Sequence, residues 1–115
     1  MSDQLFKGIA PKSSAGNEYF FYCQDFCYPL YELIATEIDE TLVPYPFLDA
    51  EAAERLGGLL QQFVEAGKAA RFYCRDAKHY EMSRSEAKDH VEMMIAITKQ
   101  FAHFLIESRG CEAVD

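Results

Sequence analysis

Residues 49–64 read DAEAAERLGGLLQQFV and carry the clearest helical pattern in the chain. The apolar residues of this stretch recur at the i, i+3, i+4, i+7 spacing of one face of an α-helix. Asp49 is placed to accept hydrogen bonds from the first turn, and Glu51 and Glu54 lie near the positive end of the helix dipole. The spacing therefore predicts an amphipathic helix whose buried face consists of Ala52, Ala53, Leu56, Leu59, Leu60, Phe63 and Val64.

Two adjacent glycines, Gly57 and Gly58, lie inside this predicted helix. Together they cost about 2 kcal/mol relative to alanines, and at 100° per residue both are expected outside the apolar face. Two interpretations stay open: a tolerated weakness or local break, and a close approach by another backbone on the outer face. Beyond Gly67 the apolar phase is nearly kept, so residues 50–82 form either one helix or two.

A second helix is predicted before this one, from a cap at Asp25 to about Glu40. Pro29 is tolerated in its first turn, where the backbone N–H has no internal partner to lose. The aromatic residues at 19–22 indicate a short strand ahead of it. Two prolines make residues 41–48 an extended connector. The buried face of this helix is expected to contain Phe26, Leu30, Leu33, Ile34 and Ile38.

A further helix is predicted to begin at Ser83, because Ser83 and Glu86 match the capping box, and to end at Ser108 before Gly110. Its main apolar face consists of Val91, Met94, Ile95, Thr98, Phe101, Ala102 and Leu105. Three more apolar residues, Met93, Ile97 and Phe104, widen this face to more than half the circumference. Such a helix either lies at the centre of the fold or presents apolar surface to a partner, including a second copy of the chain.

The chain of 115 residues is expected to form a mainly α fold of three to four helices with a short N-terminal strand. Residues 1–16 are predicted to be a flexible arm and residues 17–115 a single helical domain. No apolar run reaches the roughly 18 residues of a membrane span, and the start lacks a secretory core. A cytoplasmic location is therefore expected, with reduced thiols at Cys23, Cys27, Cys74 and Cys111.

The negative charge is concentrated in one part of the chain. The formal net charge is −8, and residues 13–54 contain nine acidic residues and no lysine or arginine. Nucleic acids and anionic membranes attract proteins through positive charge, so neither is expected as a direct ligand. Four basic residues recur later at helical spacing: Lys68, Arg71, Arg75 and Lys78. The favoured interpretation is that they form a solvated helix face, which pairs with the acidic part of the same or another molecule.

The motifs of common catalytic sites are absent from the sequence. There is no glycine-rich phosphate loop and no nucleophile elbow. Cys23 and Cys27 at i, i+4 could supply two zinc ligands, with Cys74, His79 or Cys111 completing the set, but cysteines among aromatic residues usually act as small apolar side chains. His90 and His103 point about 140° apart on one ideal helix, and Glu86 with His90 is most simply a solvated pair. No metal and no cofactor are expected.

Three strings resemble a loose group of small bacterial helical proteins without known activity. The strings are residues 29–34 (PLYELI), 48–63 (LDAEAAERLGGLLQQF) and 101–110 (FAHFLIESRG). The group shares an aromatic opening helix, an Asp-capped central helix and a closing Phe-Ala-x-Phe-Leu helix. The closing turn here is Arg109-Gly110, where the group usually has two glycines. The resemblance implies the order of helices and no activity.

The leading hypothesis is a non-enzymatic protein that binds, and inhibits or masks, a basic partner that handles nucleic acid. By size and charge it is analogous to nuclease immunity proteins and to phage inhibitors of host defence such as anti-CRISPR proteins. The predicted partner-binding residues are Glu32, Glu37, Asp39, Glu40, Tyr45, Phe47, Glu51 and Glu54. The alternatives are a metal- or thiol-dependent enzyme that uses Cys23, Cys27 and a histidine, and a homo-oligomer assembled through Met93, Ile97 and Phe104.

Overall fold

Residues 3–114 are described by a computed structural model, except for the side chain of Gln24. This part of the chain contains four α-helices and a four-stranded sheet, so the expected mainly α fold is confirmed. The elements follow in the order β1 Gln4–Gly8, η1 Ser14–Gly16, β2 Glu18–Phe21, α1 Gln24–Leu33, η2 Ile34–Asp39, η3 Glu40–Leu42, β3 Phe47–Leu48, α2 Ala50–Glu65, α3 Lys68–His79, α4 Arg84–Ser108 and β4 Cys111–Val114. Here η1 and η3 are 3₁₀ turns and η2 is a π-helical turn.

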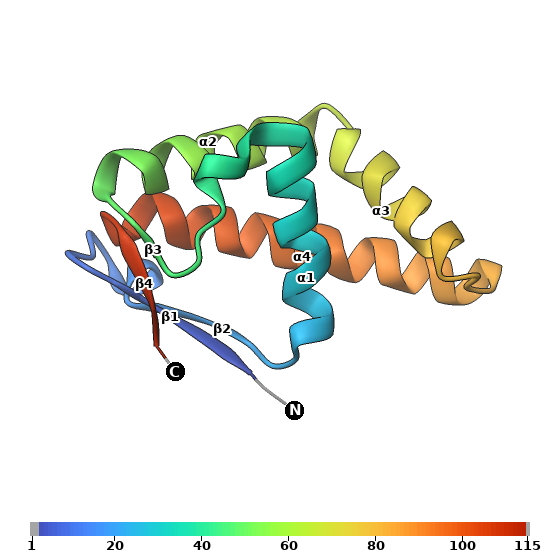
Figure 1. Ribbon diagram of the computed structural model, residues 1–115, viewed down its shortest axis with the longest axis horizontal. Coiled ribbons are helices and arrows are strands. Elements are labelled where there is room, and N and C mark those ends of the chain that lie inside the picture. Colours follow the sequence, from blue (N-terminus) through green and yellow to red (C-terminus); the bar gives the residue numbers. More distant parts are fainter. Residues whose placement is uncertain (1–2, 115) are drawn as a thin grey trace.

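The long helix α4 lies at the centre of the fold. It runs along the long axis of the molecule, with α2 beside one half of it and α3 beside the other (Figure 1). Met94, Phe101 and Leu105 on α4 are fully buried. Of the two interpretations of its wide apolar face, a central position in the fold is the one observed. No helix among the described residues has the length and apolarity needed to cross a bilayer.

Two of the three predicted N-terminal caps, those at Asp49 and Ser83, are present. The N–H of Ala52 donates to Oδ1 of Asp49 over 2.8 Å at the start of α2. At the start of α4, the N–H of Glu86 donates to the Ser83 hydroxyl and the N–H of Ser83 donates to the Glu86 carboxylate. These bonds satisfy N–H groups that have no partner inside the helix, which is why both helices begin where the sequence predicts.

The glycines of α2 have different surroundings. A Cβ on Gly57 would lie 2.7 Å from Cγ1 of Ile106 and 2.8 Å from the carbonyl oxygen of Ala102, so α4 approaches the backbone of α2 at this point. A Cβ on Gly58 would meet no atom within 4 Å. Another backbone does approach Gly57 closely, but on the buried side of α2, so the expectation that Gly57 lies outside the apolar face is wrong. Gly67, at a φ of 75°, ends the helix, so residues 50–82 form two helices.

The helix before the connector is less regular than its pattern predicts. Its first α-helical residue is Gln24, after Cys23, and Asp25 lies in the first turn instead of capping it. Leu30, Leu33 and Ile34 are fully buried, as expected. The backbone then widens into η2 and tightens into η3 before the connector.

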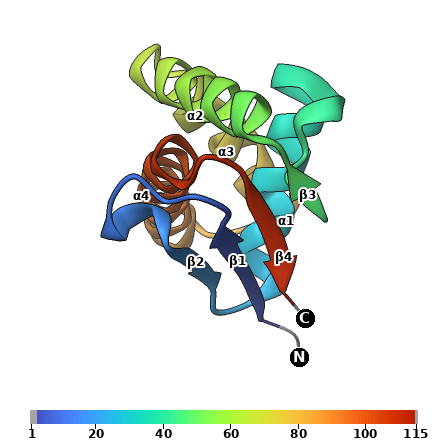
Figure 2. The ribbon, with the colours of Figure 1, turned by 90° about the vertical axis from the view of Figure 1, so that its left-hand side faces the viewer.

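The four strands form an antiparallel sheet in the order β2–β1–β4–β3. One face of the sheet lies against the helices, and the opposite face has no helix over it (Figures 1 and 2). Phe6 and Phe21 point inward and are buried, whereas Phe20 and Phe47 point outward and are 39% and 53% exposed. The sheet closes one side of the helical core.

The prediction of an arm over residues 1–16 is wrong for residues 4–8, which form the central strand β1. The strand pairs with β2 on one side and with β4 on the other. Phe6 is completely buried, and its ring lies 5.6 Å from that of Phe101. The five-residue strand carries a single fully buried side chain, and its partner β4 lies at the far end of the chain. Residues 1 and 2 of the predicted arm lie outside the described residues.

Candidate interaction surface and adjoining cavity

The predicted partner-binding residues lie on α1, the η2 and η3 turns, the connector and the first turns of α2. Asp39 is half-buried, and the other members of the set are exposed: Glu32, Glu37, Glu40, Tyr45, Phe47, Glu51 and Glu54. Tyr45 is 48% exposed and Phe47 is 53% exposed, high values for aromatic side chains. The acidic stretch of sequence therefore supplies accessible carboxylates and accessible rings.

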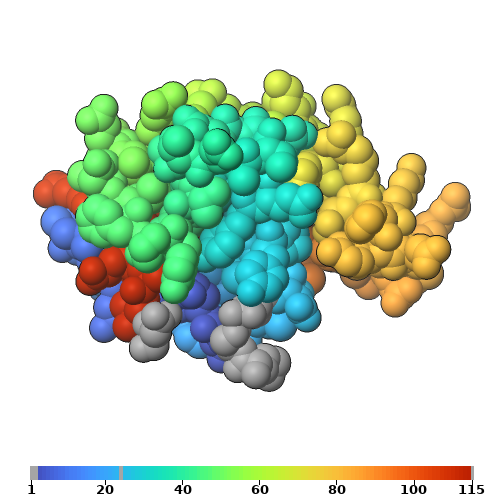
Figure 3. Space-filling model, viewed as in Figure 1, coloured from blue at the N-terminus to red at the C-terminus, as the bar shows by residue number. Residues whose placement is uncertain are grey.

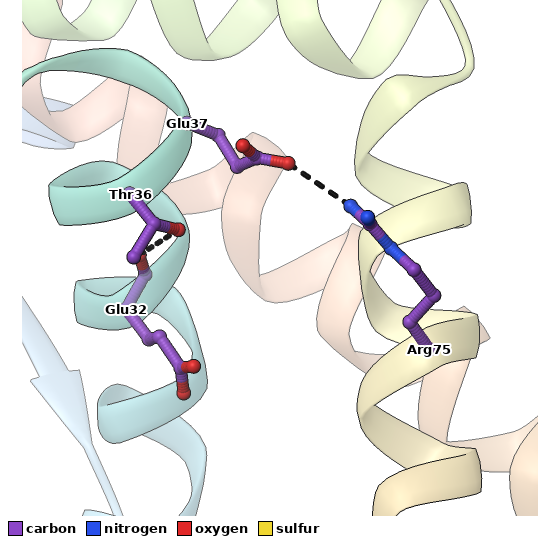
Figure 4. A network of polar contacts seen from close by, with 4 residues as sticks. All are labelled: Glu32, Thr36, Glu37 and Arg75. Carbon is purple, nitrogen blue, oxygen red and sulfur yellow. Dashed lines mark hydrogen bonds and ion pairs between the residues drawn. The ribbon is translucent and has the colours of Figure 1, made fainter.

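Arg75, a basic residue from later in the chain, contacts this acidic set. Nη2 of Arg75, on α3, donates to Oε1 of Glu37 over 2.9 Å (Figure 4). The Arg75 guanidinium also lies 5.9 Å from the centre of the Phe72 ring. The acidic and basic segments are thus paired at one point within the same molecule, which is one form of the pairing predicted for the basic residues of α3.

Asp39 has a structural task that its sequence context did not indicate. Its Oδ1 accepts hydrogen bonds from the backbone N–H of Thr41 at 2.9 Å and from the Thr41 hydroxyl at 2.6 Å. These bonds from Thr41 hold the pKa of the Asp39 carboxyl below its usual value. Asp39 thereby caps η3, and a substitution there would alter the local fold as well as the charge.

The connector that carries Tyr45 and Phe47 is attached to the body of the protein on both sides. Pro44 and Leu48 are buried, and the carbonyl oxygen of Pro46 accepts a 2.8 Å hydrogen bond from the N–H of Ala113. Strand β3 pairs with β4 directly after this bond. The two exposed rings therefore project from a segment that is held by the sheet, although the connector is short and mostly irregular.

A cavity of about 420 Å³ opens between α1, α3 and α4. In the space-filling view the surface is recessed between the cyan residues of α1 and the yellow to orange residues of α3 and the following turn (Figure 3). Its lining combines aromatic rings with carboxylates, and no lysine or arginine is found among the described lining residues. The lining residues are Asp25, Phe26, Tyr28, Pro29, Glu32, Asp76, Tyr80, Met82 and His90.

His90 and Asp76, both nearly buried, lie within ion-pair distance of each other in the wall of this cavity. Nε2 of His90, on α4, lies 3.1 Å from Oδ2 of Asp76, on α3, and the two side chains are 12% and 9% exposed. Glu86 is engaged in the capping box at the start of α4. His90 therefore pairs with Asp76 and does not form the solvated i, i+4 pair with Glu86 that the sequence suggests.

The cavity is not predictable from a local sequence pattern, because its walls come from three helices. Asp76 and His90 are fourteen residues apart on different helices, so no short spacing joins them. One local signal was available. Asp25, Tyr28 and Glu32 recur at i, i+3 and i+7 on a single helix, which places carboxylates and a ring on one exposed face.

The cysteines are not gathered into a ligand set. Within residues 3–114, no group of three or more His, Cys, Asp or Glu side chains is arranged to hold a metal ion. Cys27 and Cys111 are buried, Cys23 is half-buried and Cys74 is exposed on α3. Burial raises the pKa of Cys27 and raises that of Cys111 to about 12. Among these residues, Cys23, Cys27 and a histidine therefore do not form a metal-binding group.

The apolar flank of α4 is only partly accessible. Phe104 is 1% exposed and packs against the ring of Phe101, so it is not available to a second copy of the chain. Met93 is 37% exposed, and with Ile97 it lines a groove beside the edge strand β2. The Tyr19 hydroxyl donates to the carbonyl oxygen of Ile97 along this groove, and burial raises its pKa to about 12. Of the three residues predicted to form a homo-oligomer interface, Phe104 is therefore buried and unavailable.

Searches with the chain against protein-family models, curated proteins and solved structures gave no match. The resemblance to small bacterial helical proteins therefore transfers no function to this chain.

Proposed function

We propose that this protein is a non-enzymatic interaction protein that binds a partner protein with a basic surface. The observation that carries the proposal is the exposure of Tyr45 and Phe47 on a connector held by the sheet, in a chain segment that also exposes Glu40, Glu51 and Glu54. Aromatic side chains on a supported segment are frequent energetic anchors of protein interfaces.

The surrounding charges suit a basic partner. Exposed carboxylates raise the rate at which a positively charged surface is encountered, and they contribute less to the affinity once the complex has formed. A partner that handles nucleic acid offers a surface of this kind, where carboxylates can occupy the places of phosphates. Binding there would exclude the nucleic acid, so the proposed consequence is inhibition or masking of the partner.

Two of the predicted carboxylates, those of Glu37 and Asp39, already have contacts within the protein. Glu37 is paired with Arg75 and Asp39 caps η3, so substitution of either changes more than the surface charge. Glu40, Glu51 and Glu54 are exposed and take part in no ion pair within the described residues. These three are the carboxylates that report on partner binding most directly.

The experiment compares two triple variants that change the net charge by the same amount. Glu40→Lys, Glu51→Lys and Glu54→Lys together should slow association with the copurified partner and weaken its dependence on salt. The control reverses three exposed acids elsewhere, namely Asp3→Lys, Glu65→Lys and Glu92→Lys. Tyr45→Ala with Phe47→Ala should mainly accelerate dissociation. Equal association rates and salt dependences for the two triple variants would show that this surface does not bind the partner.

A further inference from the structure

The cavity between α1, α3 and α4 has properties that the proposed surface does not use. Rings and carboxylates both face a single concave space, and the described lining contributes no lysine or arginine. Its volume of about 420 Å³ falls in the range of pockets that receive small ligands or single side chains. An occupant of this space would contact both kinds of group at once.

The charges around the cavity favour a cation. Asp25 and Glu32 are exposed at its rim, and Asp76 lies in its wall. His90 is the one basic side chain in the described lining, and it faces Asp76. Arg75 lines an adjoining pocket that shares Glu32, Asp76 and Tyr80 with this cavity. Its guanidinium reaches from α3 to Glu37, and the Glu32 carboxylate points away from that contact (Figure 4).

The rings at the rim also favour a cation. Tyr28 on α1 is 56% exposed and Tyr80 after α3 is 64% exposed. The face of an aromatic ring attracts a cation through its quadrupole, and a planar guanidinium can stack on it as well. Tyrosine rings next to carboxylates at the mouth of the cavity therefore indicate a cationic occupant more specifically than the carboxylates alone would.

The turn after α3 holds Tyr80 and Met82 at the cavity. The N–H of Met82 donates to the carbonyl oxygen of Ala77 over 3.1 Å, and the N–H of Glu81 donates to the carbonyl oxygen of Lys78 over 3.0 Å. This pair of bonds is the Schellman closure of a helix, with Glu81 at a φ of 54° where glycine is usual. The turn thus fixes both lining residues through backbone bonds.

We propose that this cavity receives one arginine side chain of the partner protein. A guanidinium can stack on a tyrosine ring while it donates paired hydrogen bonds to a carboxylate, whereas an ammonium group cannot match both geometries. The inference rests on the proposed function, because it names the group that a basic partner would insert. It adds an anchor point on α1 and α3, separate from the connector that carries Tyr45 and Phe47.

The test uses a small probe and does not require the partner to be known. N-acetyl-L-arginine amide is titrated into ¹⁵N-labelled protein, with the uncharged citrulline analogue and N-acetyl-L-lysine amide as comparisons. Chemical-shift changes for the arginine probe should concentrate at Tyr28, Asp76, Tyr80 and His90. The citrulline analogue should give no saturable change, and the lysine analogue should bind several-fold more weakly.

Variants then tie the binding to the cavity. Asp25→Asn with Glu32→Gln removes two rim charges and should weaken the arginine probe about tenfold. Glu65→Gln with Glu92→Gln makes the same change in net charge at exposed positions outside the cavity and should alter the affinity less than twofold. Tyr80→Leu, which keeps an apolar side chain in the turn, should also weaken binding. The amide spectrum of each variant shows directly whether the fold is kept.

Several results would overturn the inference. Equal binding of the citrulline or lysine analogue would remove the assignment to arginine, and an unchanged affinity in the Asp25→Asn, Glu32→Gln variant would place the probe elsewhere. Unchanged partner association in that same variant would show that the cavity is not the anchor. Failure of the proposed function is read separately, from unchanged partner association after reversal of Glu40, Glu51 and Glu54.

Discussion

Arg75 on α3 and Glu37 on η2 are joined by a 2.9 Å ion pair, although the first residue lies in the charge-balanced half of the sequence and the second in the acidic stretch. Their side chains are 65% and 32% exposed, so solvent and salt screen the attraction. The pair therefore connects two elements at the surface without contributing much free energy.

A double-mutant cycle on Arg75→Gln and Glu37→Gln tests this statement. We expect a coupling of less than about 1 kcal/mol in the free energy of unfolding, and a smaller value at high salt. Urea denaturation of the four proteins at low and at high ionic strength measures it. A coupling of several kcal/mol that does not respond to salt would mean that the pair is effectively buried.

The glycines of α2 give a matched pair of substitutions. Gly57→Ala places a methyl group against Ile106 and the carbonyl oxygen of Ala102, so α4 must move, and we expect a loss of about 1–3 kcal/mol. Gly58→Ala adds a methyl group in open space within a helix and should gain about 1 kcal/mol. Thermal or urea unfolding measures both, and the same sign for the two variants would contradict the close packing of α2 on α4.

A buried hydrogen bond between α3 and α4 supplies the next prediction. The Thr98 hydroxyl donates to the carbonyl oxygen of Met94 over 2.6 Å, so the Tyr73 hydroxyl, 2.8 Å from Thr98, must donate to it. Both residues are fully buried, and burial raises the pKa of Tyr73. Thr98→Val leaves the Tyr73 hydroxyl without its acceptor and should cost about 1–3 kcal/mol.

Removing the second hydroxyl should recover part of that loss. The variant Thr98→Val with Tyr73→Phe no longer buries an unsatisfied donor, so we expect it to be more stable than Thr98→Val alone. Equilibrium unfolding of the single and double variants makes the comparison. If the double variant is the less stable of the two, the hydroxyl of Tyr73 has another acceptor after the first substitution.

Most features set by neighbouring residues were predictable from the sequence, with the start of α1 at Gln24 as an exception, and features set by distant residues were not. The caps at Asp49 and Ser83 need partners only three residues away, and both were correct. Strand β1 depends on β4 more than a hundred residues later, and the cavity depends on Asp76 and His90 from two helices. The acidic stretch was visible as composition, but the proximity of Arg75 to Glu37 follows from how α3 packs.

The four thiols should react at different rates. Cys74 is exposed on α3, while Cys27 and Cys111 are buried and have raised pKa values, so less thiolate forms there at neutral pH. We expect an aromatic disulfide reagent to modify Cys74 fastest, and Cys27 and Cys111 only as the protein unfolds. Mass spectrometry of digested samples over time measures the order, and rapid modification of Cys111 in the folded protein would contradict the packing of β4.

The capping box of α4 predicts a specific dependence of stability on pH. Hydrogen bonds to the Ser83 N–H and to the Ser83 hydroxyl, the first having the larger effect, hold the pKa of the Glu86 carboxyl below its usual value of 4.5. A carboxyl whose pKa is lower in the folded state contributes stability that is complete above the unfolded pKa and is lost as the pH falls through the folded value. The difference in unfolding free energy between the wild type and Glu86→Ala should therefore be constant near neutral pH and shrink below about pH 4.5.

Glu86→Gln keeps an oxygen acceptor but does not titrate, so its loss of stability relative to the wild type should be smaller and should also diminish on acidification. Urea unfolding of the three proteins from pH 7 to pH 3 measures these differences, and a Glu86→Ala difference that stays constant over the whole range would show that the carboxylate does not hold the cap.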